Sequence, residues 1–235
     1  MALNFKERAE LQEWMDEPCS FEEFRACLRD LEKSNRLTMT YRPTLDFLRR
    51  LVEGRGAGAG ALRIVDVGSG YGDMLRKIAR WAEREGVEVA LTGVDLNPHA
   101  ARAAREVSGG ERIEWATGDA FSVELGEVDV VICSLFTHHL REEEIVRFLR
   151  WMEVTARVGW FVNDLHRAWV PYYLYGALAR VMRWHRFVRH DGPVSIRRSF
   201  VAEDWARMIA AAGLDEGAVR VREYFPARLC VERLK

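Results

Sequence analysis

The residues of this chain with the clearest chemical potential follow a short apolar run. The segment IVDVGSGYGD (64–73) places Asp66, Gly68, Gly70 and Gly72 at alternate positions. Glycines at a strand-to-helix turn let the backbone approach a ligand closely, and the N-terminus of the following helix offers free N–H groups. The spacing therefore predicts a small-ligand site at this turn.

Two further carboxylates end later apolar runs. Asp95 ends the run VALTGVDL (89–96), where it can accept hydrogen bonds from both ribose hydroxyls of an adenosine. Leu96 follows it and can lie against the adenine ring. Asp119 precedes Ala120 in a Gly-Asp-Ala triplet, where its carboxylate can accept a hydrogen bond from the adenine amino group. Together with the glycine turn, these positions predict a nucleoside-containing cofactor.

Three histidines follow the fourth and fifth apolar runs: His138, His139 and His166. Imidazole removes protons well near neutral pH, so each is a candidate base for an acceptor hydroxyl, and each can equally be a capping or buried side chain. Since adjacent residues usually point apart, we expect at most one of His138 and His139 to face the site. Asp164 lies two positions before His166 and is expected to tune it.

No metal is expected, because no cluster of carboxylates follows the fourth run and no His–Cys spacing resembles a zinc site. The pair Asp164 and His166 is the one arrangement in the sequence that would allow a metal to bind. The four cysteines form no CxxC pair, so free buried thiols are expected.

A strand–helix alternation must position these groups. It predicts a doubly wound, Rossmann-like α/β fold, with a seven-stranded, mostly parallel sheet and helices on both faces. The carboxyl ends of its parallel strands share the edge where ligands bind in such sheets. The expected strands are 62–68, 89–96, 112–120, 129–136, 159–165, 218–225 and 227–234.

The N-terminal residues 1–53 predict a helical cap. A first helix is expected from a loose apolar face between Leu3 and Trp14, and a second from the capping box of Ser20 and Glu23. A third helix is expected to begin near Pro43. The glycine-rich segment 54–60 is interpreted as a flexible linker to a domain over 61–235.

Residues 167–199 predict a lid-like insertion after the fifth strand. Its part 168–188 has the pattern of one amphipathic helix, whose aromatic side chains either line a pocket or pack onto the sheet. Its arginines would suit anionic lipid or RNA, but a solvated charged face is the simpler interpretation. These arginines are Arg180, Arg183, Arg186 and Arg189.

The bulk composition narrows the class of partner. The chain has 235 residues, 35 basic and 36 acidic, and a net charge of −1, so no overall field attracts nucleic acid or an anionic membrane. We find no signal peptide and no run long enough to span a membrane, so a cytoplasmic protein is expected, with peripheral membrane contact a minor alternative. The composition does not fix the oligomeric state.

The motifs, taken in order, resemble those of the class I S-adenosylmethionine-dependent methyltransferases. They are the D-x-G-x-G-x-G stretch at 66–72, Asp95, the GDAF stretch at 118–121 and DVVICSLFTHHL at 129–140. The resemblance covers about residues 62–235. It implies that the glycine turn passes beneath the methionine part of the cofactor, that the acid after the second strand binds the ribose, and that the GDA acid binds the adenine amine. The implied cofactor-binding residues are Asp66, Gly68, Gly70, Gly72, Asp95, Leu96, Asp119 and Ala120.

Arg42 is added from its own chemistry, as an ion-pair candidate for the cofactor carboxylate. Three further segments resemble a bacterial subgroup associated with polyketide and phenolic or quinone-like substrates. They are LEKSNRLTMTYR (31–42), NDLHR (163–167) and HDGPVSIRRSF (190–200).

The expected function is therefore methyl transfer from S-adenosylmethionine to a small-molecule acceptor, at the hydroxyl of a phenolic or polyketide-derived ring. C-methylation of a quinone-like ring, a nucleic-acid or protein methyltransferase, and a non-catalytic binding subunit are the alternatives. SLFTHH stands where amino-directed nucleic-acid enzymes resemble one another in an (Asn/Asp)-Pro-Pro-(Tyr/Phe) stretch. The register G-x-G-x-G also differs from the G-x-G-x-x-G of dehydrogenases. A small-molecule enzyme should have an enclosed aromatic pocket.

Overall fold

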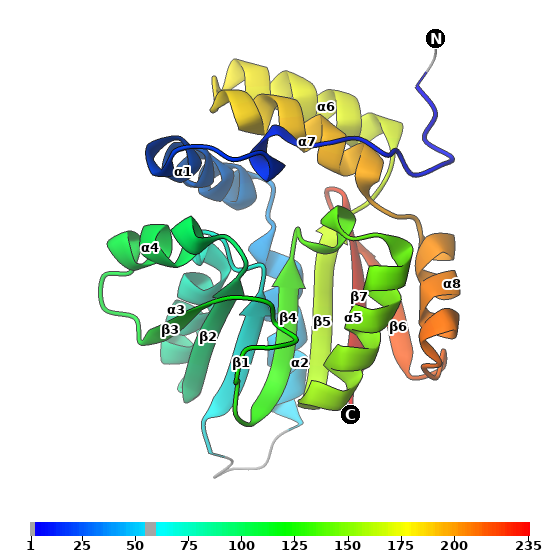
Figure 1. Ribbon diagram of the computed structural model, residues 1–235. Coiled ribbons are helices and arrows are strands. Elements are labelled where there is room, and N and C mark those ends of the chain that lie inside the picture. The colour runs from blue at the N-terminus through cyan, green and yellow to red at the C-terminus, as the bar shows by residue number, and fades with distance from the viewer. Residues whose placement is uncertain (1–2, 55–59) are drawn as a thin grey trace.

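The computed structural model describes residues 3–54 and 60–235 of the chain. One sheet contains seven strands in the order β3-β2-β1-β4-β5-β7-β6. β1 to β5 run parallel, and β7 is antiparallel to both β5 and β6 (Figure 1). The strands are β1 (Leu62–Val67), β2 (Val89–Asp95), β3 (Ile113–Thr117), β4 (Val128–Ser134), β5 (Ala156–Leu165), β6 (Val219–Tyr224) and β7 (Arg228–Leu234).

Apolar side chains on both faces of the central strands explain why the sheet is covered on both sides. Ile64 and Val130 pack in one core with α2 (Tyr41–Glu53) and α3 (Asp73–Glu85). Their neighbours Val65 and Val131 pack in the other core with α5 (Glu142–Thr155) and α8 (Ala202–Ala212). Successive strand residues point to opposite faces, so an unbroken apolar run such as β4 needs helices on both. A further helix, α4 (Pro98–Val107), contacts β2 and β3.

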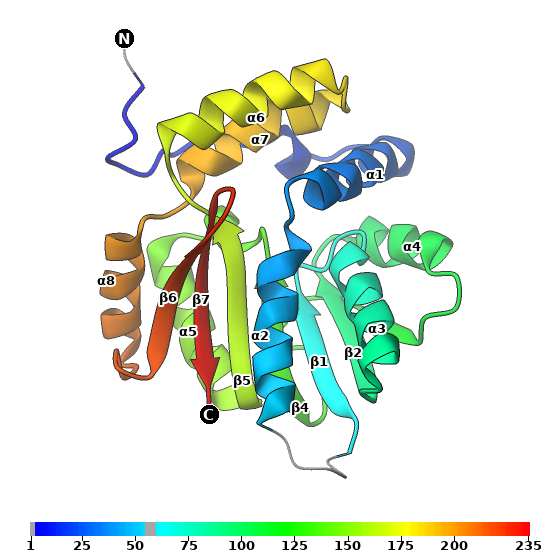
Figure 2. The same cartoon turned by 180° about the vertical axis from the view of Figure 1, so that it is seen from behind.

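A separate layer of helices lies above the carboxyl edge of the parallel strands (Figures 1 and 2). It consists of α1 (Phe21–Leu37), α6 (Trp169–Val181), α7 (Arg186–Arg198) and the short η1 (Trp14–Asp16). α7 contacts α6, α1, η1 and the short η2 (Thr137–His139) that follows β4. This layer closes the edge at which the sequence places its chemical groups.

The fold class is confirmed, and the strands begin and end within three residues of the expected positions. Ser20 accepts a hydrogen bond from the Glu23 amide at 3.2 Å, as the capping pattern predicted. The third helix begins at Tyr41, two residues before Pro43. The division into a cap and a domain over 61–235 stays a prediction, and residues 55–59 of the expected linker lie outside the described residues.

Two expected helices are wrong. Residues 3–13 form no helix, because Arg8 and Ala9 direct their hydrogen bonds to residues far along the chain. The single helix expected over 168–188 is two helices, α6 and α7, separated at residues 182–185. Arg183 has a φ of 52° there, which ends the helical turn. No helix in the described part of the chain has the length and apolarity that crossing a bilayer requires.

Candidate active site

A cavity of about 570 Å³ lies at the carboxyl edge of the sheet, beneath the helical layer. Its wall includes the glycine turn after β1, η2 after β4, the segment 37–41 between α1 and α2, and the inner sides of α6 and α7. Apolar side chains dominate the upper part, including Leu31, Leu178 and Ile196. Tyr175 is the aromatic side chain from α6 that lines it, and Tyr41, Tyr71 and Phe225 line it from other elements.

The three glycines of the turn all have positive φ, but the space around each of them differs. At Gly72 a side chain would overlap the Trp115 ring, and at Gly68 it would lie within 2.7 Å of the Phe136 ring. A side chain at Gly70, where φ is 48°, would have Leu28 as its nearest neighbour, at 3.8 Å. Gly68 and Gly72 are therefore required for packing, whereas Gly70 leaves open space at the cavity wall.

Asp66 places an unpartnered oxygen at this wall. Its side chain is buried, and Oδ1 has no hydrogen-bond partner among the described residues. Burial raises the pKa of Asp66 well above its usual value, and the nearby carboxylates of Asp73 and Asp95 add to the shift. Because an unsatisfied buried acceptor is costly, such an oxygen is suited to a donor supplied by a ligand.

Asp95 links the end of β2 to the glycine turn. Its Oδ2 accepts a hydrogen bond from the Gly70 amide and its Oδ1 one from the Asn97 amide, both at 2.8 Å. Each carboxylate oxygen keeps a second lone pair for a ligand hydroxyl. Burial raises the pKa of Asp95, and these two amide bonds oppose that shift.

Gly72, Asp95 and the remaining predicted cofactor residues do not themselves line the cavity. Leu96 and Asp119 are exposed beyond Asp95, and Ala120 is buried in the core. Arg42 is exposed on α2 and pairs with Asp46 at 3.6 Å. The structure thus brings together the glycine turn, Asp66 and Asp95, and it places Arg42 in solvent.

His138 is the histidine most firmly held at the cavity. The residue is 2% exposed, and its Nδ1 lies 2.7 Å from Asp164 Oδ1. The Thr137 hydroxyl and the His138 amide both donate to Asp164 Oδ2, at 2.5 and 3.0 Å. Burial alone would raise the pKa of Asp164, but His138 and these hydrogen bonds hold it well below its usual value. The ionised Asp164 keeps the proton on Nδ1, so Nε2 presents a lone pair.

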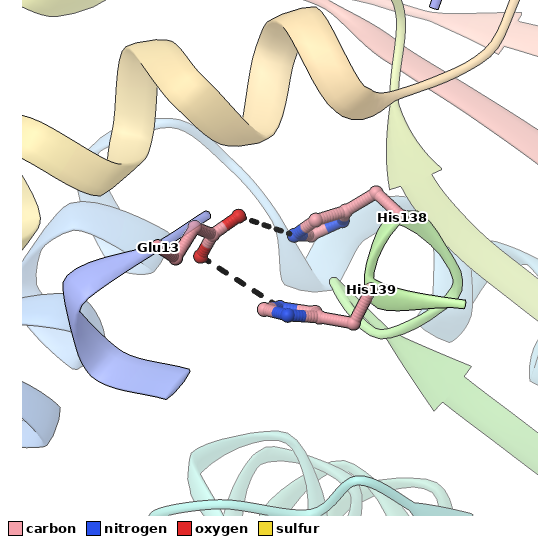
Figure 3. A group of neighbouring side chains, drawn as sticks. All are labelled: Glu13, His138 and His139. Atoms are coloured by element: carbon pink, nitrogen blue, oxygen red, sulfur yellow. Dashed lines mark ion pairs between the residues drawn. The ribbon is translucent and has the colours of Figure 1, made fainter. Parts of the chain in front are cut away.

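Both adjacent histidines face the same buried carboxylate, contrary to our expectation. The Nε2 atoms of His138 and His139 lie 3.6 and 3.8 Å from the two carboxylate oxygens of Glu13 (Figure 3). Both imidazoles line the cavity, because the tight turn of η2 sets their rings 4.4 Å apart. His139 Nδ1 also lies 3.2 Å from Asp16, and although burial opposes it, His139 lowers the pKa of Asp16 to about 2.

Glu13 is a site residue that the sequence did not reveal. Burial raises its pKa to about 7, against the opposing charges of His139 and Arg198. The Ser195 hydroxyl donates to Glu13 Oε1 at 2.9 Å, and Arg198 lies 3.5 Å from the same oxygen. Glu13 lies more than a hundred residues from these partners along the chain, and no local motif marks it.

Glu13, His138 and His139 are also the described residues that could hold a metal, since their ligand atoms lie within 4.8 Å of one another. The guanidinium of Arg198 already compensates the charge of the carboxylate in this set.

His166 and two other polar residues lie differently from expectation. His166 follows β5 but does not line the cavity, and Asp164 binds His138 instead of His166. Arg228, at the start of β7, lines the cavity, and its buried guanidinium donates to Thr38 and Thr40. Burial lowers the pKa of Arg228.

The aromatic side chains of the insertion divide between interior and surface. Trp184 and Phe187 are buried between α6, α7 and α1, whereas Trp169 and Tyr173 are exposed. Tyr175 shares a hydrogen bond of 2.8 Å with Ser34 of α1, and its ring occupies the space where a side chain at Gly192 of α7 would lie.

A protein-family model matches the central part of the chain. Residues 64–159, from β1 into β5, match the family model described as a methyltransferase domain. Together with the strand order, this match decides the fold. The chain has the class I methyltransferase fold. A comparison with curated protein sequences finds no match.

Solved structures with this fold resemble the chain at low identity. Magnesium protoporphyrin IX methyltransferase from Synechocystis PCC 6803, with bound SAM, is 15% identical with a TM-score of 0.53, covering 84% of this chain and 80% of its own. Human N-acetylserotonin methyltransferase, in complex with SAM, is 15% identical with a TM-score of 0.64, covering 92% and 56%. The CMeT domain of the citrinin polyketide synthase is 17% identical with a TM-score of 0.59, covering 83% and 52%. The chain thus spans about half of the last two proteins.

Proposed function

We propose that this chain transfers the methyl group of S-adenosylmethionine to a hydroxyl of a small-molecule acceptor, on a phenolic or polyketide-derived ring. One observation carries the proposal: the glycine turn and His138, which Asp164 holds from behind, line the same cavity. That cavity, about 570 Å³, has the size of small-molecule sites in proteins and a mostly apolar wall. A methyl donor bound at the glycine turn and an acceptor hydroxyl bound at His138 would therefore lie together inside the cavity.

The described residues fit S-adenosylmethionine. The unpartnered Oδ1 of Asp66 offers an acceptor for an ammonium group, and Gly70 leaves the space that the methionine part needs. Asp95 keeps lone pairs for ribose hydroxyls, and Asp119 lies exposed for the adenine amine. Arg42 has no part in this proposal, because it pairs with Asp46 in solvent. SAM in two structures of the same fold supports the assignment.

The chain's own residues would orient the acceptor and take its proton. When bound, S-adenosylmethionine supplies an electrophilic methyl group. Methyl transfer is an in-line displacement, so positioning of the acceptor oxygen accounts for much of the rate. His138 Nε2 accepts the hydroxyl proton, and Asp164 stabilises the resulting imidazolium through Nδ1–H. His139 and Glu13 close the cavity beside this nitrogen.

The catalytic assignment is tested with His138→Ala and Asp164→Asn. Loss of the base should lower kcat by about 10²- to 10⁴-fold, while the affinity for S-adenosylhomocysteine stays unchanged. His166→Ala is the matched control, because His166 does not line the cavity, and it should keep full turnover. Full turnover in His138→Ala would mean that positioning alone suffices.

The cofactor assignment is tested by calorimetric titration with S-adenosylhomocysteine. Asp95→Ala should weaken binding about 10- to 100-fold, since hydrogen bonds to a charged group contribute roughly 1.5–3 kcal/mol. Asp46→Ala, on the exposed side of α2, is the control and should bind as the parent does. A parent protein that binds neither S-adenosylmethionine nor its demethylated product would contradict the proposed function.

A further inference from the structure

The outward side of α6 is largely apolar, and only Arg180, near the C-terminal end of the helix, is charged there. The α6 face consists of Trp169, Val170, Tyr173, Leu174 and Val181, which fall within an arc of about 140° at 3.6 residues per turn. Trp169 is 63% exposed, Leu174 65% and Val181 78%. A contiguous apolar surface of this kind usually marks a site of interaction, because single-chain proteins seldom leave one in water.

The α6 face continues into the opening of the active-site cavity. Five apolar side chains both line the cavity and remain exposed, and together they form its mouth: Leu37, Met39, Val170, Leu174 and Phe225. Phe225, which is 76% exposed, lies at the tip of the β6–β7 hairpin, and that tip points toward α6 (Figure 2). Whatever covers the α6 face therefore also meets the entrance to the cavity.

The chain segment that carries this face has charged residues of one sign only. Residues 166–190 contain five arginines and no aspartate or glutamate. Arg167 is buried against Asp204, and Arg186 pairs with Glu23. The remaining three, Arg180, Arg183 and Arg189, are exposed, and no carboxylate of the described residues lies within ion-pair distance of them.

We propose that the α6 face docks onto the surface of an anionic lipid bilayer, and that the acceptor enters the cavity from the lipid through the apolar mouth. Tryptophan and tyrosine beside aliphatic residues, with arginines at the end of the same face and beside it, are the composition of helices that lie in a membrane interface. Each basic residue near an anionic surface adds about 1 kcal/mol of attraction. The entry of the acceptor rests on the proposed function, whereas the docking itself does not.

A second copy of the chain fits this face less well. In a symmetric dimer the same surface meets itself, so both copies would bring Arg180 and Arg183 to an interface whose segments carry no compensating carboxylate. RNA would use the arginines but would leave the aliphatic stripe in water. A bilayer satisfies both features at once.

Docking is tested by co-sedimentation of the full chain with vesicles. Vesicles of phosphatidylcholine with roughly 30% phosphatidylglycerol should bind more protein than vesicles of phosphatidylcholine alone. Trp169→Glu and Val181→Glu should each lower the bound fraction about tenfold, because a carboxylate on this face loses apolar burial and is repelled by the lipid. Val154→Glu is the matched control: Val154 is 87% exposed on α5, away from the α6 face, and this variant should bind as the parent does.

Three results would overturn the docking proposal. They are no sedimentation with either vesicle, an equal loss in Val154→Glu, and a Trp169-dependent dimer in analytical ultracentrifugation without vesicle binding. Titration with S-adenosylhomocysteine verifies that each variant is folded.

Acceptor entry has its own readout. Trp169→Glu should lower turnover of a long-chain alkylphenol held in anionic vesicles by about tenfold and leave turnover of a water-soluble phenol unchanged. An equal loss on both acceptors would contradict entry from the lipid. A protein that binds vesicles yet methylates no acceptor would contradict the proposed function and leave docking intact.

Discussion

At the scale of single residues, the site depends on which partner each ionisable group finds. The positions of Asp66, Asp95 and Asp119 at the carboxyl edge could be predicted because each lies within two residues of the end of a parallel strand, and strand ends gather at one edge of the sheet. Glu13 could not, since its partners are histidines and an arginine far along the chain. Asp164 was expected beside His166, but β5 ends at Leu165, before His166, and the turn after β4 brings His138 to Asp164 instead.

Glu13 should make the stability of the protein depend on pH. Its pKa is raised to about 7, so between about pH 4.5 and 7 the folded chain holds a proton that the unfolded chain has lost. The free energy of unfolding should therefore fall as pH rises through this window, by on the order of 3 kcal/mol or less.

Urea denaturation of Glu13→Gln at several pH values measures this contribution. The variant should lose the Glu13-dependent part of the slope and gain stability relative to the parent above pH 7. A parent and variant with parallel pH profiles would show that Glu13 is ionised in the folded protein throughout this range.

At the scale of elements, the glycines of the turn between β1 and α3 have two roles: some are needed for packing, and one leaves space for the ligand. Gly70→Ala adds a methyl group toward open space at the cavity wall, at a cost of about 1–2 kcal/mol for the left-handed backbone. We expect a folded protein whose affinity for S-adenosylhomocysteine falls at least tenfold.

Gly72→Ala is the matched comparison within the same turn. Its new methyl group would overlap the Trp115 ring, so overpacking should lower the free energy of unfolding by about 3 kcal/mol, more than in Gly70→Ala. Thermal unfolding and calorimetry on both variants separate the two effects. Comparable stability in the two would contradict the roles assigned to these glycines.

The regular elements could be predicted far better than the irregular ones. Strand positions follow from apolar runs with turns between them, and the structure places all seven as expected. The extended path of residues 3–13 depends on long-range hydrogen bonds that periodicity does not reveal. Likewise, the break between α6 and α7 lies at residues 182–185, where no glycine or proline marks it.

At the scale of the whole molecule, Arg8 ties the N-terminal segment to two distant elements. Its guanidinium donates to the carbonyls of His138 and Leu140, at 2.6 and 2.7 Å, and to that of Arg198 at 2.5 Å. These bonds fix both η2 and the end of α7 above the sheet. The segment that carries Glu13 to the cavity is thereby held in place.

Arg8→Ala should therefore destabilise the protein beyond what a surface arginine does. We expect the free energy of unfolding to fall by about 2–4 kcal/mol, as three carbonyls lose a charged donor. Arg49→Ala, which removes an exposed pair with Asp46, should change it by less than about 1 kcal/mol. Equal effects in urea denaturation would mean that the segment is held without Arg8.

The phenol ring of Tyr175 has a consequence for the range of acceptors. It faces the cavity from α6, and its hydroxyl shares a hydrogen bond with Ser34 of α1. Its ring packs against Gly192 of α7, in the space that a larger side chain there would need. An acceptor too bulky for the cavity can displace this ring only by breaking its hydrogen bond to α1 and its packing against α7 at the same time. In a homologous series of acceptors, turnover should therefore end abruptly at one size, where a single yielding side chain would produce a gradual decline.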